Sequence, residues 1–78
     1  MSIIFAVSDK INTSETEFHS KVTNTVDQII TGYLARLGAS HLMSRELCLQ
    51  RGDEFFTIDM TVGECNIANG DHLFLTGF

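Results

Sequence analysis

The sequence predicts a small α+β domain in which one helix covers one face of a four- to five-stranded sheet. Three observations predict it: strand-like segments open and close the chain, a single central stretch has helical apolar spacing, and 78 residues suffice for one domain. Neither the helix nor the sheet can bury its apolar side alone, so the two must pack together. We expect a single domain over residues 1–78, with a short C-terminal tail at residues 76–78.

Two strands are expected before the helix. Residues 2–8 (SIIFAVS) are apolar, β-branched and too few for a helix, which is typical of a buried central strand. Residues 15–22 (ETEFHSKV) alternate between polar and less polar positions, as in a strand with one wet face. The two segments are close enough in sequence to form a hairpin.

The helix is expected at residues 25–37. Thr25 and Gln28 have the spacing of a capping box, and Gly38 is placed to end the helix. Gly32 lies inside it at a cost of about 1 kcal/mol against alanine, which we interpret as a close contact between helix and sheet. The apolar stripe has the i, i+3, i+4 spacing of one helix face and consists of Val26, Ile29, Ile30, Tyr33, Leu34 and Leu37.

Three further strands are expected after the helix, at residues 46–51, residues 55–58 and residues 72–75. Residues 61–66 are polar and broken by glycine, which fits a single helical turn. Ile67 is expected to plug the core, and the Asn-Gly pair at residues 69–70 is a turn signal.

Composition excludes several classes of function. The formal net charge is −5, because five Lys and Arg face ten Asp and Glu. An acidic surface repels phosphate, so neither nucleic acid nor an anionic membrane is an expected partner. Cys48 and Cys65 form no paired motif, and unpaired thiols fit a reducing cytoplasm. Residues 1–10 lack the pattern of a signal peptide, and no apolar run approaches the roughly 18 residues of a membrane span.

The sequence contains no signature of an enzyme. It has no glycine-rich phosphate loop, no Cys-x-x-Cys, no His-x-x-x-His and no serine nucleophile elbow. His19, His41 and His72 are far apart, so we interpret them as surface or interface residues. The two cysteines are interpreted as small, at least half-buried apolar residues. We expect no catalytic residue, metal or cofactor.

Several short motifs occur in a recognisable order. Residues 25–29 (TVDQI) are similar to a Thr-Ile-x-x-Val helix start, and residues 3–7 (IIFAV) to a first strand. Thr61, Asn66 and Ile67 match a threonine-opened turn and an Asn-Ile plug, followed by a His-Leu-x-Leu strand at residues 72–75. With these motifs the chain resembles the ubiquitin-like β-grasp family over nearly its whole length. The resemblance implies a mixed sheet and a protein that acts by being bound.

The sheet face opposite the helix is one candidate functional surface. Leu73 and Leu75 share one face of the last strand, which leaves His72 and Phe74 on the other, together with Cys48 of the third strand. In ubiquitin-like proteins the corresponding strands present an apolar patch to binding domains. We therefore expect Cys48, His72 and Phe74 to form a partner-binding surface, since aromatic side chains are enriched in interface hot spots.

The C-terminus is the second candidate. Ubiquitin-type modifiers end in glycine, and their precursors often carry extra residues that a protease removes. The resemblance therefore implies that Gly77 is the conjugation point, attached through an isopeptide bond after Phe78 is cleaved off, as in a bacterial-type conjugation system. Two departures are that Thr76 stands where a second glycine is usual, and that the tail is short.

These features lead to one expected function and two alternatives. The first is a monomeric, cytoplasmic, ubiquitin-like modifier whose partners are activating and conjugating enzymes and a processing protease. The second is a non-conjugated ubiquitin-like interaction module. The third is a small structural β-grasp subunit of a multicomponent monooxygenase, since residues 59–64 (DMTVGE) resemble a stretch of that subunit. The terminus separates them, because only a modifier needs a free glycine carboxylate.

Overall fold

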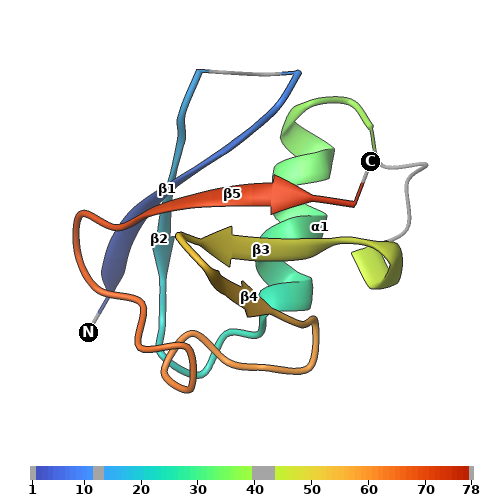
Figure 1. Cartoon of the computed structure of the whole chain (residues 1–78). Coiled ribbons are helices and arrows are strands. Elements are labelled where there is room, and N and C mark those ends of the chain that lie inside the picture. The colour runs from blue at the N-terminus through green and yellow to red at the C-terminus, as the bar shows by residue number, and fades with distance from the viewer. Residues whose placement is uncertain (1, 12–13, 40–43, 78) are drawn as a thin grey trace.

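The structure is a computed structural model of the chain and describes residues 2–11, 14–39 and 44–77. Within these residues, one sheet of five strands is covered on one face by one helix (Figure 1). The elements in chain order are β1 (Ile3–Asp9), β2 (Thr16–Ser20), α1 (Val26–Arg36), the short 3₁₀ turn η1 (Ser44–Glu46), β3 (Cys48–Arg51), β4 (Glu54–Phe56) and β5 (His72–Thr76).

The strand order is β2-β1-β5-β3-β4. The first strand, β1, runs antiparallel to β2 and parallel to β5, while β3 is antiparallel to both β5 and β4. The sheet is therefore mixed, with the first and last strands side by side at its centre. This confirms the α+β fold and the ubiquitin-like β-grasp arrangement that the sequence predicts.

Both ends of α1 are built as the sequence predicts. Thr25 is the N-cap: its Oγ1 accepts from the Gln28 backbone N–H at 3.2 Å, and Gln28 Oε1 accepts from the Thr25 N–H at 2.9 Å. At the other end Gly38 has a φ of 71°, and the Ala39 N–H donates to the Leu34 carbonyl at 2.9 Å. This is a Schellman ending, in which a left-handed residue that favours glycine lets the last carbonyls find donors.

Strand boundaries differ from the prediction at several places, and the first two strands are observed at Ile3–Asp9 and Thr16–Ser20. The third strand begins at Cys48, because Glu46, its expected first residue, ends η1. The fourth strand ends at Phe56 rather than at residue 58. Thr76, expected in the tail, is the last residue of β5 and pairs with Cys48. Sequence alternation marks the middle of a strand better than its ends, which depend on where the neighbouring strand stops.

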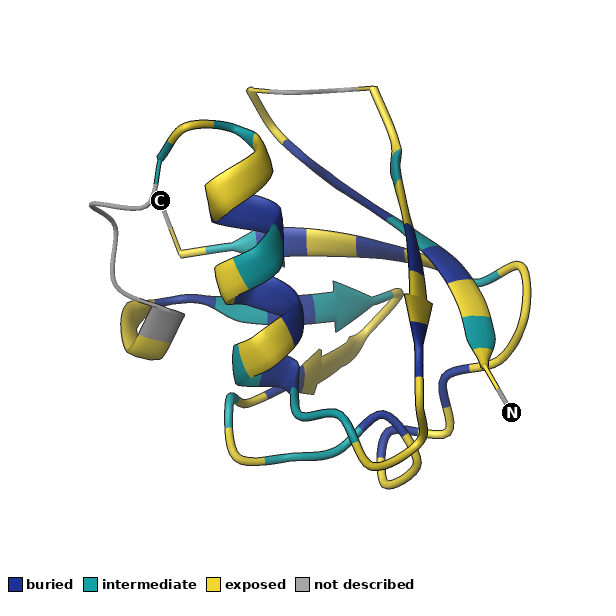
Figure 2. Cartoon of the chain, turned by 180° about the vertical axis from the view of Figure 1, so that it is seen from behind, coloured by how far each residue is buried: buried dark blue, intermediate teal, exposed yellow. Residues whose placement is uncertain are grey.

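The core lies between α1 and the inner face of the sheet (Figure 2). Gly32 contacts this layer, but a Cβ built on it would lie 3.5 Å from Phe18 Cε1, which is ordinary van der Waals separation. The contact with the sheet exists, yet it does not require glycine. The buried apolar residues are Phe5, Val7, Phe18, Val26, Ile29, Ile30, Tyr33, Leu34, Leu47, Leu49, Phe56, Val62, Cys65, Ile67, Leu73 and Leu75.

One hydrogen-bonded polar pair is buried within that core. Asp9 is 1% exposed, and its Oδ2 accepts a hydrogen bond of 2.6 Å from the hydroxyl of Tyr33, which is fully buried. Asp9 Oδ1 accepts from the Ile11 backbone N–H at 2.7 Å. Burial and the neighbouring Asp9 raise the pKa of the Tyr33 hydroxyl, because both disfavour its ionised form.

The segment between β4 and β5 is fixed by polar contacts. Thr61 and Glu64 exchange hydrogen bonds of 2.9 and 3.1 Å, and Thr61 forms a bridge to Thr25 at the start of α1. Ile67 is 5% exposed and fills the core beneath this segment, as predicted. Arg51 donates to Asp71 Oδ2 at 2.8 Å and so ties β3 to the start of β5.

Arg36 covers part of the free edge of β2. Its guanidinium lies 4.4 Å from the centre of the Phe18 ring and donates a 2.9 Å hydrogen bond to the Glu17 backbone carbonyl. The last turn of α1 is thereby fastened to the edge strand of the sheet.

Candidate protein-binding surface

The outer face of the sheet is formed by the residues that alternate with core residues along each strand. In β5 Leu73 and Leu75 are fully buried, whereas Phe74 between them is 38% exposed and His72 is also exposed. Phe74 pairs with Gln50 of β3 on one side and with Ser8 of β1 on the other. Paired residues in a sheet point to the same side, so these side chains share the outer face.

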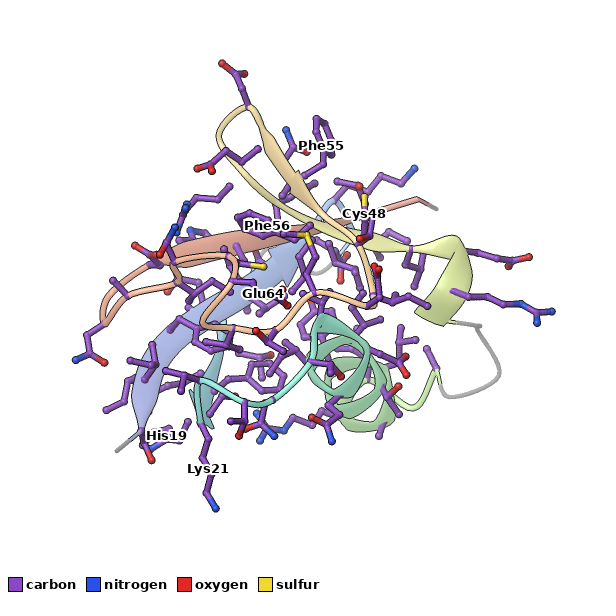
Figure 3. All side chains as sticks on the ribbon, turned by 90° about the horizontal axis from the view of Figure 1, so that it is seen from below. His19, Lys21, Cys48, Phe55, Phe56 and Glu64 are labelled. Carbon is purple, nitrogen blue, oxygen red and sulfur yellow. The ribbon has the colours of Figure 1, made fainter. Side chains whose placement is uncertain are left out.

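Phe55 adds a second exposed aromatic residue to this face. It is 59% exposed and pairs with Gln50 of β3, which itself pairs with Phe74. Phe55 in β4 and Phe74 in β5 therefore lie on either side of Gln50. Figure 3 shows Phe55 and Cys48 pointing away from α1, while Phe56 next to Phe55 points into the core. We define the outer patch as Cys48, Gln50, Phe55, His72 and Phe74.

Two shallow hollows open at the outer patch. The larger has a volume of about 430 Å³ and is lined by Gln50, Gly52, His72, Leu73 and Phe74. The smaller, of about 200 Å³, lies on the other side of Phe74 and is lined by Lys10, Phe74, Leu75, Thr76 and Gly77. Phe74 therefore stands as a ridge between two depressions, a shape that can receive side chains of a partner.

His72 is held between two oxygen groups. Its Nε2 lies 2.8 Å from the hydroxyl oxygen of Ser8, which is 4% exposed, and its Nδ1 lies 3.5 Å from Glu15 Oε1. These three residues lie on one face of the sheet. Because the Ser8 hydroxyl is buried, their geometry does not support a reaction at that oxygen. The contacts fix the orientation of the imidazole at the edge of the outer patch.

Cys48 and Cys65 are both free thiols, but they lie in different surroundings. Cys48 is half-buried on the outer face, with its Sγ 3.0 Å from Thr76 Oγ1. Cys65 is buried in the core, where burial raises the pKa of its thiol. Cys65 is thus a buried core residue, as expected, and Cys48 belongs to the outer patch.

Gly77 lies against the fold. Its φ is 114°, and a Cβ at this position would stand 2.6 Å from the Glu46 carbonyl oxygen and 3.0 Å from Leu47 Cδ2. Backbone conformation and close approach both favour glycine here. Phe78 and His41 lie outside the described residues.

The structure places the expected surface residues together. Cys48, His72 and Phe74 lie on one face of two adjacent strands, and Gly77 borders the smaller hollow beside Phe74. Sequence reasoning overlooked Phe55, although the neighbouring pair of phenylalanines in a short strand meant that one had to face outward. Within the described ranges, no three His, Cys, Asp or Glu side chains are arranged to hold a metal ion. The same residues include no helix long and apolar enough to span a bilayer.

The chain was compared with known families, curated proteins and solved structures. A family model described as the USP40 ubiquitin-like domain matches residues 1–77. No curated protein matches. Among solved structures, the ubiquitin of Caldiarchaeum subterraneum is similar with a TM-score of 0.80 at 16% identity, over 100% of this chain and 95% of that one. A chain in the structure of the toluene 4-monooxygenase HD complex with the inhibitor 4-bromobenzoate has a TM-score of 0.77 at 12% identity, over 100% of both chains.

Proposed function

The chain belongs to the family of the USP40 ubiquitin-like domain, and on that premise we propose that it is a non-catalytic protein-interaction module. In this proposal partner proteins bind the outer patch, while α1 packs against the opposite face of the sheet and stabilises the fold. The observation that carries this proposal is that Phe55 and Phe74, at 59% and 38% exposure, share one sheet face beside a hollow.

Packing alone does not explain why two aromatic side chains are exposed on this face. A phenylalanine side chain wholly in water forgoes about 1.5–3 kcal/mol of burial, and these two partly exposed rings forgo a share of it. Clustered apolar exposure on a small domain marks an interaction site more often than isolated exposure does. The adjacent Gln50 and His72 supply polar groups at the border, as in interfaces with an apolar centre and a polar rim.

Photo-crosslinking tests this proposal directly. A photoreactive phenylalanine analogue is placed at Phe55 on the outer patch and, as a control, at Thr31 on the exposed face of α1. The expected result is a discrete covalent partner from position 55 and none from position 31. That partner should be lost on Phe74→Ala and retained on Val22→Ala, which trims an exposed apolar residue elsewhere. Equal crosslinking from both positions contradicts the proposal.

Conjugation through Gly77 is the second candidate function. In this proposal a protease removes Phe78, an activating enzyme that uses ATP adenylates Gly77, and an isopeptide bond to a target follows in the cytoplasm. Gly77 is exposed and lies at the end of β5, which supports it. The backbone geometry at this position accounts for glycine independently, so we rank conjugation below the interaction module.

Peptide mass spectrometry distinguishes the two functions. Protein produced with its neighbouring genes is digested, and the spectra are searched for a lysine carrying a remnant that ends in Gly77. Such remnants support conjugation. Unmodified chains alone, in the presence of an active activating enzyme, contradict it and leave the interaction module.

A monooxygenase subunit is the third candidate, and it rests on residues 59–64 and on the similar fold. In this chain those residues have structural tasks: Val62 is fully buried and Thr61 contacts the start of α1. Packing therefore accounts for them without an oxygenase. Co-purification of oxygenase subunits with the tagged chain supports this candidate, and their absence when they are co-expressed contradicts it.

A further inference from the structure

The outer patch is bounded by carboxylates on the side of β2. Glu17 is exposed and pairs in register with Ala6 of β1, which in turn pairs with His72. Glu15 contacts the ring of His72, which lines the larger hollow. We call Glu15 and Glu17 the acidic edge. The backbone of β2 lies two strand spacings, about 10 Å, from β5, and the Glu15 side chain reaches across that distance to His72.

Within residues 2–11, 14–39 and 44–77, no Lys or Arg forms a salt bridge with the acidic edge. The Glu15 and Glu17 carboxylates instead contact the imidazoles of His72, at 3.5 Å, and of His19, at 2.9 Å. Asp53, next to Gly52 at the opposite border of the larger hollow, adds a third exposed carboxylate.

Within the described residues, the basic side chains do not pair with the carboxylates of the acidic edge. Arg36 contacts the Glu17 backbone rather than its carboxylate, Lys21 follows the end of β2, and Arg45 lies in η1. Arg36 is bound to Phe18 and to the Glu17 carbonyl, and Arg51 is bound to Glu54 and Asp71. Lys10 lines the smaller hollow, on the far side of Phe74 from the larger one. A partner that covers the larger hollow therefore meets negative charge on two sides.

We infer that the segment which docks on the outer patch is a basic amphipathic peptide segment of a protein. It inserts an aliphatic or aromatic side chain into the larger hollow beside Phe74 and sets Arg or Lys against Glu15 and Glu17. This inference rests on the proposed interaction function and adds the chemistry of the partner. Charge complementarity of this kind raises the association rate and selects the partner, while the apolar anchor supplies most of the affinity.

Three synthetic peptides test the inference on the full chain. The first combines leucine anchors with flanking arginines, the second replaces the arginines with glutamates, and the third replaces the leucines with serines. Amide NMR titration is expected to show binding of the first peptide alone, with shifts at Gln50, His72 and Phe74 and affinity that falls as salt rises. Equal binding of the arginine and glutamate peptides, shifts confined to α1, or no binding by the arginine peptide overturns the inference.

Charge-removing variants separate this inference from the proposed function. Glu15→Gln and Glu17→Gln are each expected to weaken the arginine peptide about two- to fivefold and to reduce its salt dependence. Asp27→Asn removes the same charge on α1, behind the sheet, and is expected to leave binding unchanged. If Phe74→Ala abolishes partner binding while the glutamine variants bind as tightly as wild type, the proposed function stands and the inference fails. If none of these variants matters, both fail.

Discussion

The two faces of the sheet differ in how far their side chains are buried, although the same strands form both. On the inner face of β5, Leu73 and Leu75 are fully buried beneath α1. On the outer face of the same strand, Phe74 keeps more than a third of its surface in water. The short strand β4 repeats the contrast, because Phe56 is 3% and Phe55 59% exposed.

The contrast teaches which residues serve the fold and which are available for binding. An inner side chain is fixed by its neighbours in a close-packed layer, so its size and shape matter. A well-exposed outer side chain such as Phe55 has fewer such neighbours, so the fold can lose it at little cost. Each of the following predictions tests one side of this division.

The largest effect is expected from the neighbouring phenylalanines of β4. Phe56→Ala empties a core position and removes the ring over which Arg51 lies, at 5.3 Å, so it should cost about 3–5 kcal/mol. Phe55→Ala should change the free energy of unfolding by no more than about 0.5 kcal/mol. Urea unfolding curves of the two variants measure both values. Similar losses for the two would break the distinction between the faces.

A smaller loss is expected when the buried hydroxyl is removed. Tyr33→Phe leaves the Asp9 carboxylate in the core without its 2.6 Å donor and should cost about 1–3 kcal/mol. Asp9→Asn in the same background should recover part of the loss, because a neutral amide is less costly to bury. Additive effects of the two substitutions would show that the residues do not interact.

Alkaline pH should weaken the protein through the same residue. The folded state holds the pKa of Tyr33 above its ordinary 10.0, so stability is intact below about pH 10 and falls as pH rises further. The loss should approach about 1.4 kcal/mol per pH unit, and Tyr33→Phe should lack it. Because Tyr33 is the only tyrosine and there is no tryptophan, tyrosine absorbance reports the ionisation directly.

The smallest effect is a gain. Gly32→Ala adds a methyl group at ordinary contact distance from Phe18 and removes a flexible residue from the middle of α1. Stability should rise by about 0.5–1 kcal/mol. A thermal melt shifted downward instead would mean that α1 approaches the sheet more closely than the structure shows.

Most of the fold could be predicted from the sequence, because each element carries a local physical signal. The capping box at Thr25, the apolar stripe of α1 and the turn at Asn69-Gly70 identify elements without reference to the rest of the chain. Alternation in β5 likewise predicted that Phe74 faces outward. These are properties of short segments, which the folded chain preserves.

The parts that escaped prediction depend on contacts between distant residues. Thr76 joins the sheet only because Cys48 lies opposite it, a pairing across 28 positions. The position of Gly77 against Glu46 and the contact between Glu15 and His72 are likewise long-range. The acidic edge of the candidate surface could not be found before the register of β2, β1 and β5 was known.

Arg36 also bears on how this chain resists self-association through its edge strand. An edge strand offers unpaired backbone groups on which a second copy can add a strand, which is a route to aggregation. At β2 the Glu17 carbonyl already receives the Arg36 guanidinium, and the cation beside Phe18 would have to be displaced by any incoming strand. The contact of Arg36 with β2 thus protects one edge of the sheet against strand addition, and leaves the outer face accessible.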